Sequence, residues 1–199
     1  TILVDKSELW KGKPYKPLSS VNYSAKGRNH HGRITSRNHG GGHKQKYRQI
    51  DFYRRKFNMT AEVERVEYDP NRSCYIMLVK FEDGQKFYYL APQNIKPGDK
   101  VENGSNIEVK VGNCLPLQDI PVGIDIHNVE LQPGAGGKIA RSAGTSVSIS
   151  GIDGNYSLIK MTSGEVRKID SRSMASIGVL SNPDQKNIKI GKAGRSRWL

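Results

Sequence analysis

The chain has 199 residues and a mass of 22.2 kDa, a length that allows one domain or two small ones. Its net charge of +13 and isoelectric point near 9.8 favour a polyanionic partner, most commonly nucleic acid. Two cysteines, Cys74 and Cys114, are too few for a disulfide scaffold and lack zinc-finger spacing, which favours a reducing compartment. No apolar run approaches the roughly 20 residues that a membrane-spanning helix needs, so we expect no membrane partner.

The charge is divided by segment. Residues 1–57 hold 14 Lys and Arg against 3 Asp and Glu, a net charge of +11. Residues 58–137 carry −5 and residues 138–199 carry +7. Because a merely soluble surface mixes its signs, this division favours nucleic-acid binding through particular segments.

The first segment, residues 1–57, is predicted to be a basic extension that threads through RNA. Between residues 24 and 46 almost the only apolar residue is Ile34, and Gly, Arg, Asn and His dominate. Such a segment buries too little apolar surface to offset its ordering entropy. We expect it to be disordered alone and to become ordered on its partner.

Residues 58–133 are predicted to form a first small β-barrel. Runs of apolar and aromatic residues alternate here with turn residues, and Asp83-Gly84 indicates a hairpin. The expected strands lie at 63–68, 74–80, 85–90, 107–111 and 123–131. An oligonucleotide-binding barrel is one candidate among the antiparallel folds with this strand spacing.

Residues 134–199 are predicted to form a second small barrel. A glycine-rich stretch at 133–137 separates it from the first, and strands are expected at 147–149, 156–160 and 165–169. The turns Asp153-Gly154-Asn155 and Ser163-Gly164 join these three strands into a meander. The class is therefore all-β, while the barrel type does not follow from the pattern.

The densest functional signal lies at 27–47, where Arg, His, Gly and Lys alternate. Arginine grips a phosphate with two donors or stacks on an unpaired base, and glycine lets the backbone approach RNA closely. Two alternatives are a flexible linker and a metal site at His30, His31, His39 and His43. The linker does not explain why four of the five histidines lie here, and three glycines between His39 and His43 oppose a helical ligand pair.

The stretch Gly134–Lys138 is similar to a phosphate-binding loop but fails the pattern, because Ile139 stands where Ser or Thr is required. We still expect it to offer backbone N–H groups and the cations Lys138 and Arg141 to an RNA backbone. Catalytic constellations and cofactor motifs are missing, and His127 is expected to support a strand end. The chain is therefore predicted not to be an enzyme and to need no cofactor or metal.

Several stretches closely resemble one family, large-subunit ribosomal protein two (the universal L-two family). They are Gly-Arg-Asn-His-His-Gly-Arg-Ile-Thr-Ser-Arg and His-Gly-Gly-Gly-His-Lys-Gln-Lys-Tyr-Arg within 27–48, Val-Glu-Arg-Val-Glu-Tyr-Asp-Pro-Asn-Arg-Ser at 63–73, Ile-Pro-Val-Gly at 120–123, His-Asn-Val-Glu at 127–130, Ala-Arg-Ser-Ala-Gly-Thr at 140–145 and Gly-Lys-Ala-Gly-Arg-Ser-Arg-Trp at 191–198. The resemblance covers nearly the whole chain.

The resemblance implies an oligonucleotide-binding-like barrel followed by an SH3-like barrel, bound to ribosomal RNA near the peptidyl-transferase region and taking part in subunit association. Neighbouring ribosomal proteins are further expected partners. Together with the composition, it gives the RNA-binding residues Arg28, His30, Arg33, Arg37, His39, Gly40, Gly41, Gly42, His43, Lys44, Lys46, Tyr47, Arg48, Arg54, Arg55, Lys138, Arg141, Ser142, Arg195 and Arg197.

Members of the family continue beyond the Arg-Trp that matches Arg197 and Trp198 into a basic tail. The family histidine linked to peptide-bond formation lies in that tail, so no catalytic role is carried onto this chain. We expect the tail either to be lost by truncation or to be a second polypeptide, and the latter favours the mitochondrial matrix over a plastid or bacterial cytoplasm. An RNA-modifying enzyme and a DNA-binding architectural protein are the rival hypotheses.

Overall fold

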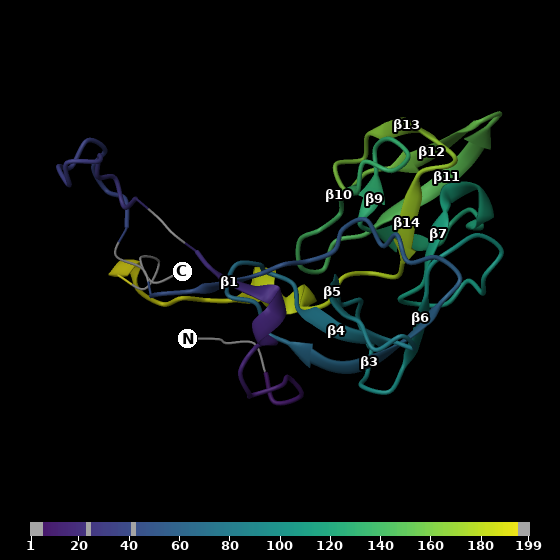
Figure 1. The fold of residues 1–199 in the computed structure, drawn as a ribbon. Helices are drawn as coiled ribbons and strands as arrows, with labels where there is room; N and C mark the ends of the chain where they lie inside the picture. Colours follow the sequence, from purple (N-terminus) through teal and green to yellow (C-terminus); the bar gives the residue numbers. More distant parts are fainter. Residues whose placement is uncertain (1–5, 23–24, 41–42, 195–199) are drawn as a thin grey trace.

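A computed structural model describes residues 6–22, 25–40 and 43–194, and within these ranges the regular structure is β-strand with three short 3₁₀ helices (Figure 1). The all-β class is thereby confirmed. The elements are η1 (Lys16–Leu18), β1 (Ser19–Val21), β2 (Lys46–Arg48), β3 (Thr60–Glu67), β4 (Ile76–Phe81), β5 (Lys86–Leu90), β6 (Lys100–Glu102), β7 (Cys114–Pro116), η2 (Leu117–Asp119), β8 (Asp125–His127), β9 (Val129–Glu130), β10 (Gly137–Ile139), β11 (Val147–Asp153), β12 (Tyr156–Lys160), β13 (Val166–Asp170), β14 (Met174–Ile177) and η3 (Pro183–Asn187). Among the residues so described, no helix is both long and apolar enough to cross a membrane.

The first sheet is antiparallel, with the strand order β5-β4-β3-β6. The predicted hairpin between β4 and β5 is confirmed: Gly84 adopts a φ of +81° in the turn, and the Asp83 carboxylate accepts from the Gln85 N–H at 3.0 Å. Alternate residues of β3, including Ala61 and Val63, point into a core with apolar and aromatic residues of β4 and β5. The strand expected at 63–68 is present as β3, which begins three residues earlier.

The second sheet has the order β13-β12-β11-β8-β14-β7, with the small β9–β10 pair beside it (Figure 1). The predicted meander is present as β11, β12 and β13, each antiparallel to the next. Its core is aliphatic, with Leu115, Ile126, Ile149 and Ile159 among the fully buried side chains. The pairing register of β11 with β12 shifts between Ile149 and Gly151, as it does at a β-bulge.

One expected strand is absent from the structure, and the two sheets divide at another place than the expected domain boundary. Residues 107–111 form no strand; Val109 and Val111 are exposed, and the segment is an irregular loop. The expected boundary at residues 133 and 134 also does not coincide with the division between the sheets. That division falls between Glu102 and Cys114, because β7 and β8 pair with β14 and β11 of the second sheet.

The N-terminal extension is partly built into the first barrel. Strands β1 and β2 pair with each other, the Tyr15 N–H donates to the Tyr88 hydroxyl at 2.8 Å, and the Asp51 N–H donates to the Tyr88 carbonyl at 3.0 Å. The part between β1 and β2 projects from the body, and the C-terminal segment after η3 extends from the body in the same direction (Figure 1). The extension of residues 1–57 is therefore anchored at both ends of its projecting loop.

The two sheets are joined by residues 179–182, which follow β14. The Ser181 N–H donates to the Ala91 carbonyl of the first barrel, and the Ser181 carbonyl accepts from the Gly144 N–H of the second, both at 3.1 Å. The Asn182 side chain adds a bond from Nδ2 to the Ser73 carbonyl at 2.6 Å. These bonds fix the turn before β4 next to the loop after β10.

Candidate nucleic-acid interface

The projecting loop contains a short hydrogen-bonded turn. Arg28 and Ile34 form an antiparallel bridge, and the Asn29 N–H donates to the Arg33 carbonyl at 3.0 Å. The Asn29 Oδ1 atom accepts from the N–H groups of His31 and Arg33, at 3.1 and 3.0 Å. The order comes from side-chain and backbone polar groups and not from an apolar core, which is why apolar content alone did not indicate it.

This loop and its return strand expose half of the expected RNA contacts. The exposed residues are Arg28, His30, Arg33, Arg37, His39, Gly40, His43, Lys44, Lys46 and Tyr47. The expected contacts Gly41, Gly42, Arg195 and Arg197 lie outside the described residues. In the described ranges, no group of three or more His, Cys, Asp or Glu side chains is placed to hold a metal.

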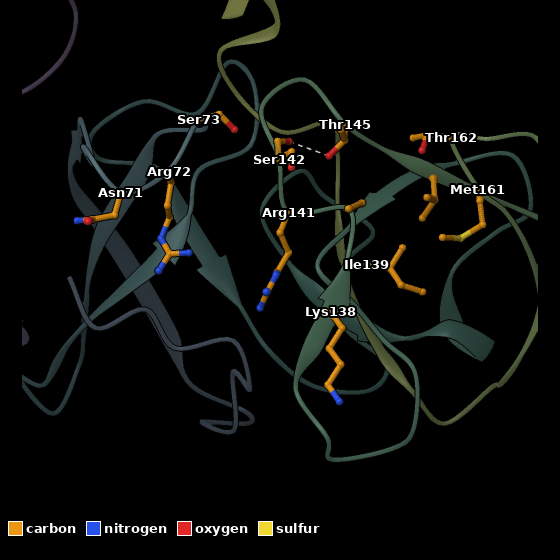
Figure 2. A pocket seen from close by; sticks show the side chains of 12 residues that line it. Asn71, Arg72, Ser73, Lys138, Ile139, Arg141, Ser142, Thr145, Met161 and Thr162 are labelled. Carbon is orange, nitrogen blue, oxygen red and sulfur yellow. Dashed lines mark hydrogen bonds between the residues drawn. The ribbon is translucent and has the colours of Figure 1, made fainter. Parts of the chain in front are cut away.

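A groove of about 520 Å³ lies between the two sheets (Figure 2). Three cations line it: Arg72 from the turn before β4, Lys138 from β10, and Arg141 from the loop after β10. In Figure 2 their charged ends point toward the same side of the groove. Ser142, also expected in the interface, lines the same space. The fold thus brings the expected Lys138, Arg141 and Ser142 together with Arg72, which the sequence prediction missed.

The two arginines of the groove are held in place by the extension. Phe52 lies between them, with its ring centroid 5.2 Å from Cζ of Arg72 and 4.4 Å from Cζ of Arg141. Arg72 also donates from Nη2 to the Tyr47 hydroxyl at 3.3 Å, and its Nε lies 3.1 Å from an Asp69 carboxylate oxygen. Each guanidinium is therefore oriented before any ligand arrives, and a preorganised donor loses less entropy on binding.

The groove is continuous with the base of the projecting loop. The Asn71 Nδ2 donates to the Lys46 carbonyl in β2 at 2.8 Å, next to the Tyr47–Arg72 hydrogen bond. Beneath the groove, the Cys74 thiol donates to the Arg141 carbonyl at 3.3 Å, and burial raises the pKa of this thiol to about 11. The thiol is therefore a neutral packing group and not a nucleophile.

The glycine-rich loop does not offer its backbone to RNA as expected. The buried Glu130 carboxylate accepts from the N–H groups of Gly136 at 2.9 Å and Gly134 at 3.1 Å. The Gly137 N–H donates to the Phe52 carbonyl at 3.0 Å. These donors are used within the fold, so the exposed side chains of Lys138 and Arg141 are what remain of the expected phosphate contact here.

Two expected contacts are structural. Arg54 is only 2 % exposed; it donates from Nη1 to the Ser176 hydroxyl at 3.0 Å and from Nη2 to the Gly112 carbonyl at 2.8 Å. Arg48 is 9 % exposed and lies 3.9 Å from the fully buried Asp69 carboxylate. Both guanidinium groups are thus buried in this structure. A basic run does not show which of its cations the fold buries.

Arg55, next to Arg54, takes the opposite orientation. Its side chain is exposed, donates to the Gly134 carbonyl at 3.1 Å and lies over the Tyr53 ring with Cζ 4.3 Å from the centroid. It therefore stays a candidate contact, on the side of the glycine-rich loop.

Comparison with known families decides the identity of the fold. A family model described as the RNA-binding N-terminal domain of ribosomal proteins L2 matches residues 15–103, and one for the C-terminal domain matches residues 110–199. The chain belongs to the ribosomal protein L2 family. The resemblance seen in the sequence is thereby confirmed, and the two matches meet where the two sheets divide.

Three bacterial proteins named large ribosomal subunit protein uL2 are similar to this L2 chain over all of its length. The protein from Pelagibacter ubique is 78 % identical and is covered over 71 % of its own length. Those from Granulibacter bethesdensis and Rickettsia canadensis are 58 % and 56 % identical, with 72 % of each covered. Because these relatives are bacterial, they give the mitochondrial expectation no support.

Proposed function

We propose that this L2 chain is a non-catalytic structural component of the large ribosomal subunit that binds and orders ribosomal RNA. The observation that carries the proposal is the continuity of the projecting loop with the groove of Arg72, Lys138 and Arg141, made by Asn71 and Tyr47. One RNA segment held in the groove thus leads directly to the loop.

The mechanism is neutralisation of RNA phosphates by cations whose positions the fold fixes. Phosphates displace their condensed counterions when they meet the lysines and arginines of loop and groove, and the release of those ions drives binding. The two oriented guanidinium groups of Arg72 and Arg141 provide paired donors that match a phosphate better than a mobile lysine does. Glycines such as Gly40, with a φ of +93°, let the loop follow the RNA surface closely.

The salt dependence of binding tests this mechanism. If about 6–10 phosphates are contacted, the affinity for large-subunit rRNA falls by roughly 10³–10⁵ between 50 and 200 mM salt. Replacing Arg141 with Ala lowers the slope of log affinity against log salt by about 1. The matched control is Arg167→Ala, because Arg167 is exposed on β13 but already paired with Glu165 at 3.1 Å. A flat salt response, or equal effects of the two substitutions, contradicts the mechanism.

We further propose the family's finer roles for this chain: support of subunit assembly, subunit association and the peptidyl-transferase region. Sedimentation of a lysate in moderate salt, followed by mass spectrometry of each fraction, tests the placement. Co-migration with the large subunit is the expected result, and a chain found only in RNA-free fractions refutes it. The same mass spectrometry tests the expected second chain, which would appear as peptides that continue the family pattern on a separate polypeptide. The compartment from which the particle is isolated, bacterial cytoplasm or mitochondrial matrix, tests the location.

The two rival hypotheses make different predictions. An RNA-modifying enzyme turns over its substrate RNA, and we expect none with the isolated chain. A DNA-binding architectural protein binds duplex DNA as tightly as rRNA, whereas a ribosomal component prefers folded RNA with exposed 2′-hydroxyl groups. Competition of labelled rRNA with unlabelled duplex DNA at one salt concentration separates these cases.

A further inference from the structure

Trp10 is an exposed aromatic residue that is nevertheless firmly anchored to the first barrel. About half of it, 49 %, is exposed to solvent. The backbone N–H of Trp10 donates to the Val66 carbonyl at 2.9 Å, and the Trp10 backbone forms a parallel bridge with Glu67 of β3. Gly12 lies against the indole, because a Cβ added there would fall only 2.5 Å from Nε1. An indole held in this way but left half open is prepared for a further contact.

Arg65 completes the arrangement from β3. Its Cζ lies 4.8 Å from the centroid of the Trp10 ring. Its Nε donates to Glu67 at 2.7 Å, and the buried Glu67 carboxylate accepts from the Tyr88 hydroxyl at 3.0 Å. The guanidinium–indole pair is thus fixed to the barrel core by a continuous set of hydrogen bonds, so it needs no ordering when a ligand binds.

The N-terminal segment that carries Trp10 is basic, while Glu64 and Glu67 lie beside Arg65 on β3. Lys6, Lys11, Lys13 and Lys16 lie in the same N-terminal segment and are exposed, against the single carboxylate of Glu8 in residues 6–16. A cleft of about 660 Å³ is lined by residues 6–9 and by Val66, whose carbonyl accepts the backbone N–H of Trp10. The Lys6 Nζ atom also lies 3.9 Å from the ring centroid of Tyr68, a residue of which 43 % is exposed. Two cation–aromatic pairs therefore join the N-terminal segment to the first barrel: Arg65 with Trp10, and Lys6 with Tyr68.

We propose that Trp10 and Arg65 form a stacking site for one unpaired base of ribosomal RNA, with the adjoining phosphates held by the lysines of residues 6–16. Aromatic side chains and guanidinium planes are the usual partners of unstacked bases, and lysines around them attract the backbone. An apolar protein partner would not account for the four lysines. The inference rests on the proposed RNA-binding function and places an additional contact on the first barrel, outside both the projecting loop and the groove.

The chain offers a direct probe, because Trp10 and Trp198 are its only tryptophans. In a full-length Trp198→Phe protein, all indole emission comes from Trp10. Titration with in vitro transcribed large-subunit rRNA is expected to quench this emission in step with binding, which is followed separately by the anisotropy of labelled rRNA. Inorganic polyphosphate is the matched control, because it binds the lysines without offering a base. It is expected to leave most of the Trp10 emission unquenched.

Affinity gives the second readout. Loss of the stacking contact with one base in Trp10→Ala should weaken the affinity for rRNA by roughly 5- to 150-fold. Trp10→Tyr retains an aromatic ring and should keep most of the affinity. Gly12→Ala, which displaces the indole without removing it, should weaken binding in the same direction. Urea unfolding of each variant shows whether the fold is kept, and the emission of the Trp198→Phe protein decides the question even if Trp10→Ala fails to fold.

The outcomes separate the two proposals. Binding of rRNA with unchanged Trp10 emission overturns the stacking site and leaves the proposed function intact. A change of emission that requires another large-subunit protein, and not rRNA, also overturns the stacking site. Failure of the unsubstituted chain to bind rRNA at all overturns the proposed function first.

Discussion

Arg54 and Arg55 are adjacent in the sequence, but the structure gives them opposite roles, and this contrast can be tested by substitution. Arg54 is buried between the sheets, where its guanidinium bonds Ser176 of β14 and the Gly112 carbonyl and lies 4.4 Å from the Tyr89 ring centroid. Arg55 is exposed beside the glycine-rich loop. We predict that Arg54→Ala destabilises the fold, whereas Arg55→Ala weakens RNA binding.

The magnitude for Arg54 follows from the groups it leaves behind. Each buried acceptor that loses its partner costs about 1–3 kcal/mol, and the cavity left by the side chain adds to this. Removal of a buried charge returns part of its desolvation cost. The free energy of unfolding should therefore fall by about 2–4 kcal/mol, a large share of the roughly 5–15 kcal/mol typical of a domain. Arg54→Met, which fills the same volume, should cost less, and both variants keep a non-glycine residue at the φ of +51°.

Urea unfolding followed by circular dichroism measures the first effect, and the slope of rRNA affinity against salt measures the second. Arg54→Ala should lower the unfolding midpoint and leave the slope unchanged in the fraction that remains folded. Arg55→Ala should change the free energy of unfolding by less than about 0.5 kcal/mol and reduce the slope by about 1. A stable Arg54→Ala protein with a reduced slope would show that Arg54 reaches RNA and would refute the assignment.

Three further predictions concern buried groups. Burial lowers the pKa of His127 from 6.5 to about 4, so the unfolded state binds a proton at a higher pH than the folded state does. The free energy of unfolding should therefore fall by up to roughly 3 kcal/mol as the pH drops from about 6.5 to about 4. His127→Gln should remove this part of the pH dependence, as measured by urea unfolding at each pH. Glu130→Gln weakens the acceptor of three N–H groups, from Gly134, Gly136 and Met174, and should cost about 1–3 kcal/mol of unfolding free energy while leaving unfolding cooperative. Burial raises the pKa of the Cys74 thiol to about 11, so iodoacetamide at pH 8 should label it only after the protein unfolds, and rapid labelling of the folded chain would show that the site opens.

Features with a local cause could be predicted from the sequence. The β4–β5 hairpin depends on Asp83 and Gly84, which supply a side-chain acceptor and a positive φ within the turn itself. The β12–β13 connection depends in the same way on Gly164, whose φ is +89° and whose N–H donates to the Met161 carbonyl at 2.9 Å. Each turn is set by residues that are neighbours in the chain, and a pattern along the chain records them.

Features that depend on distant partners could not be predicted. The residues of 107–111 have strand-like composition, yet the described part of the chain offers them no pairing strand, and the valines stay exposed. Conversely, β7 is only Cys114–Pro116, too short for a pattern, and forms because β14 supplies the pairing edge. Arg72 lies 69 positions from Arg141, and the groove they share exists only after residues 179–182 have joined the sheets.

The net charge of a segment is therefore a poor guide to which of its cations bind RNA. In the positively charged C-terminal third, three cations of the β12–β13 region already have carboxylate partners: Arg167 lies 3.1 Å from Glu165, Lys168 lies 2.6 Å from Asp153, and Arg172 lies 2.7 Å from Asp170. A phosphate must displace these partners, and the exchange of one carboxylate for another anion gains little. Lys138 and Arg141, by contrast, make no ion pair among the described residues, and they lie in the groove beside Arg72, which is itself paired with Asp69 at 3.1 Å. The same formal charge thus contributes to binding at the groove and mainly to surface pairing on the hairpin, so the groove, and not the whole C-terminal third, should account for the salt dependence of the second barrel.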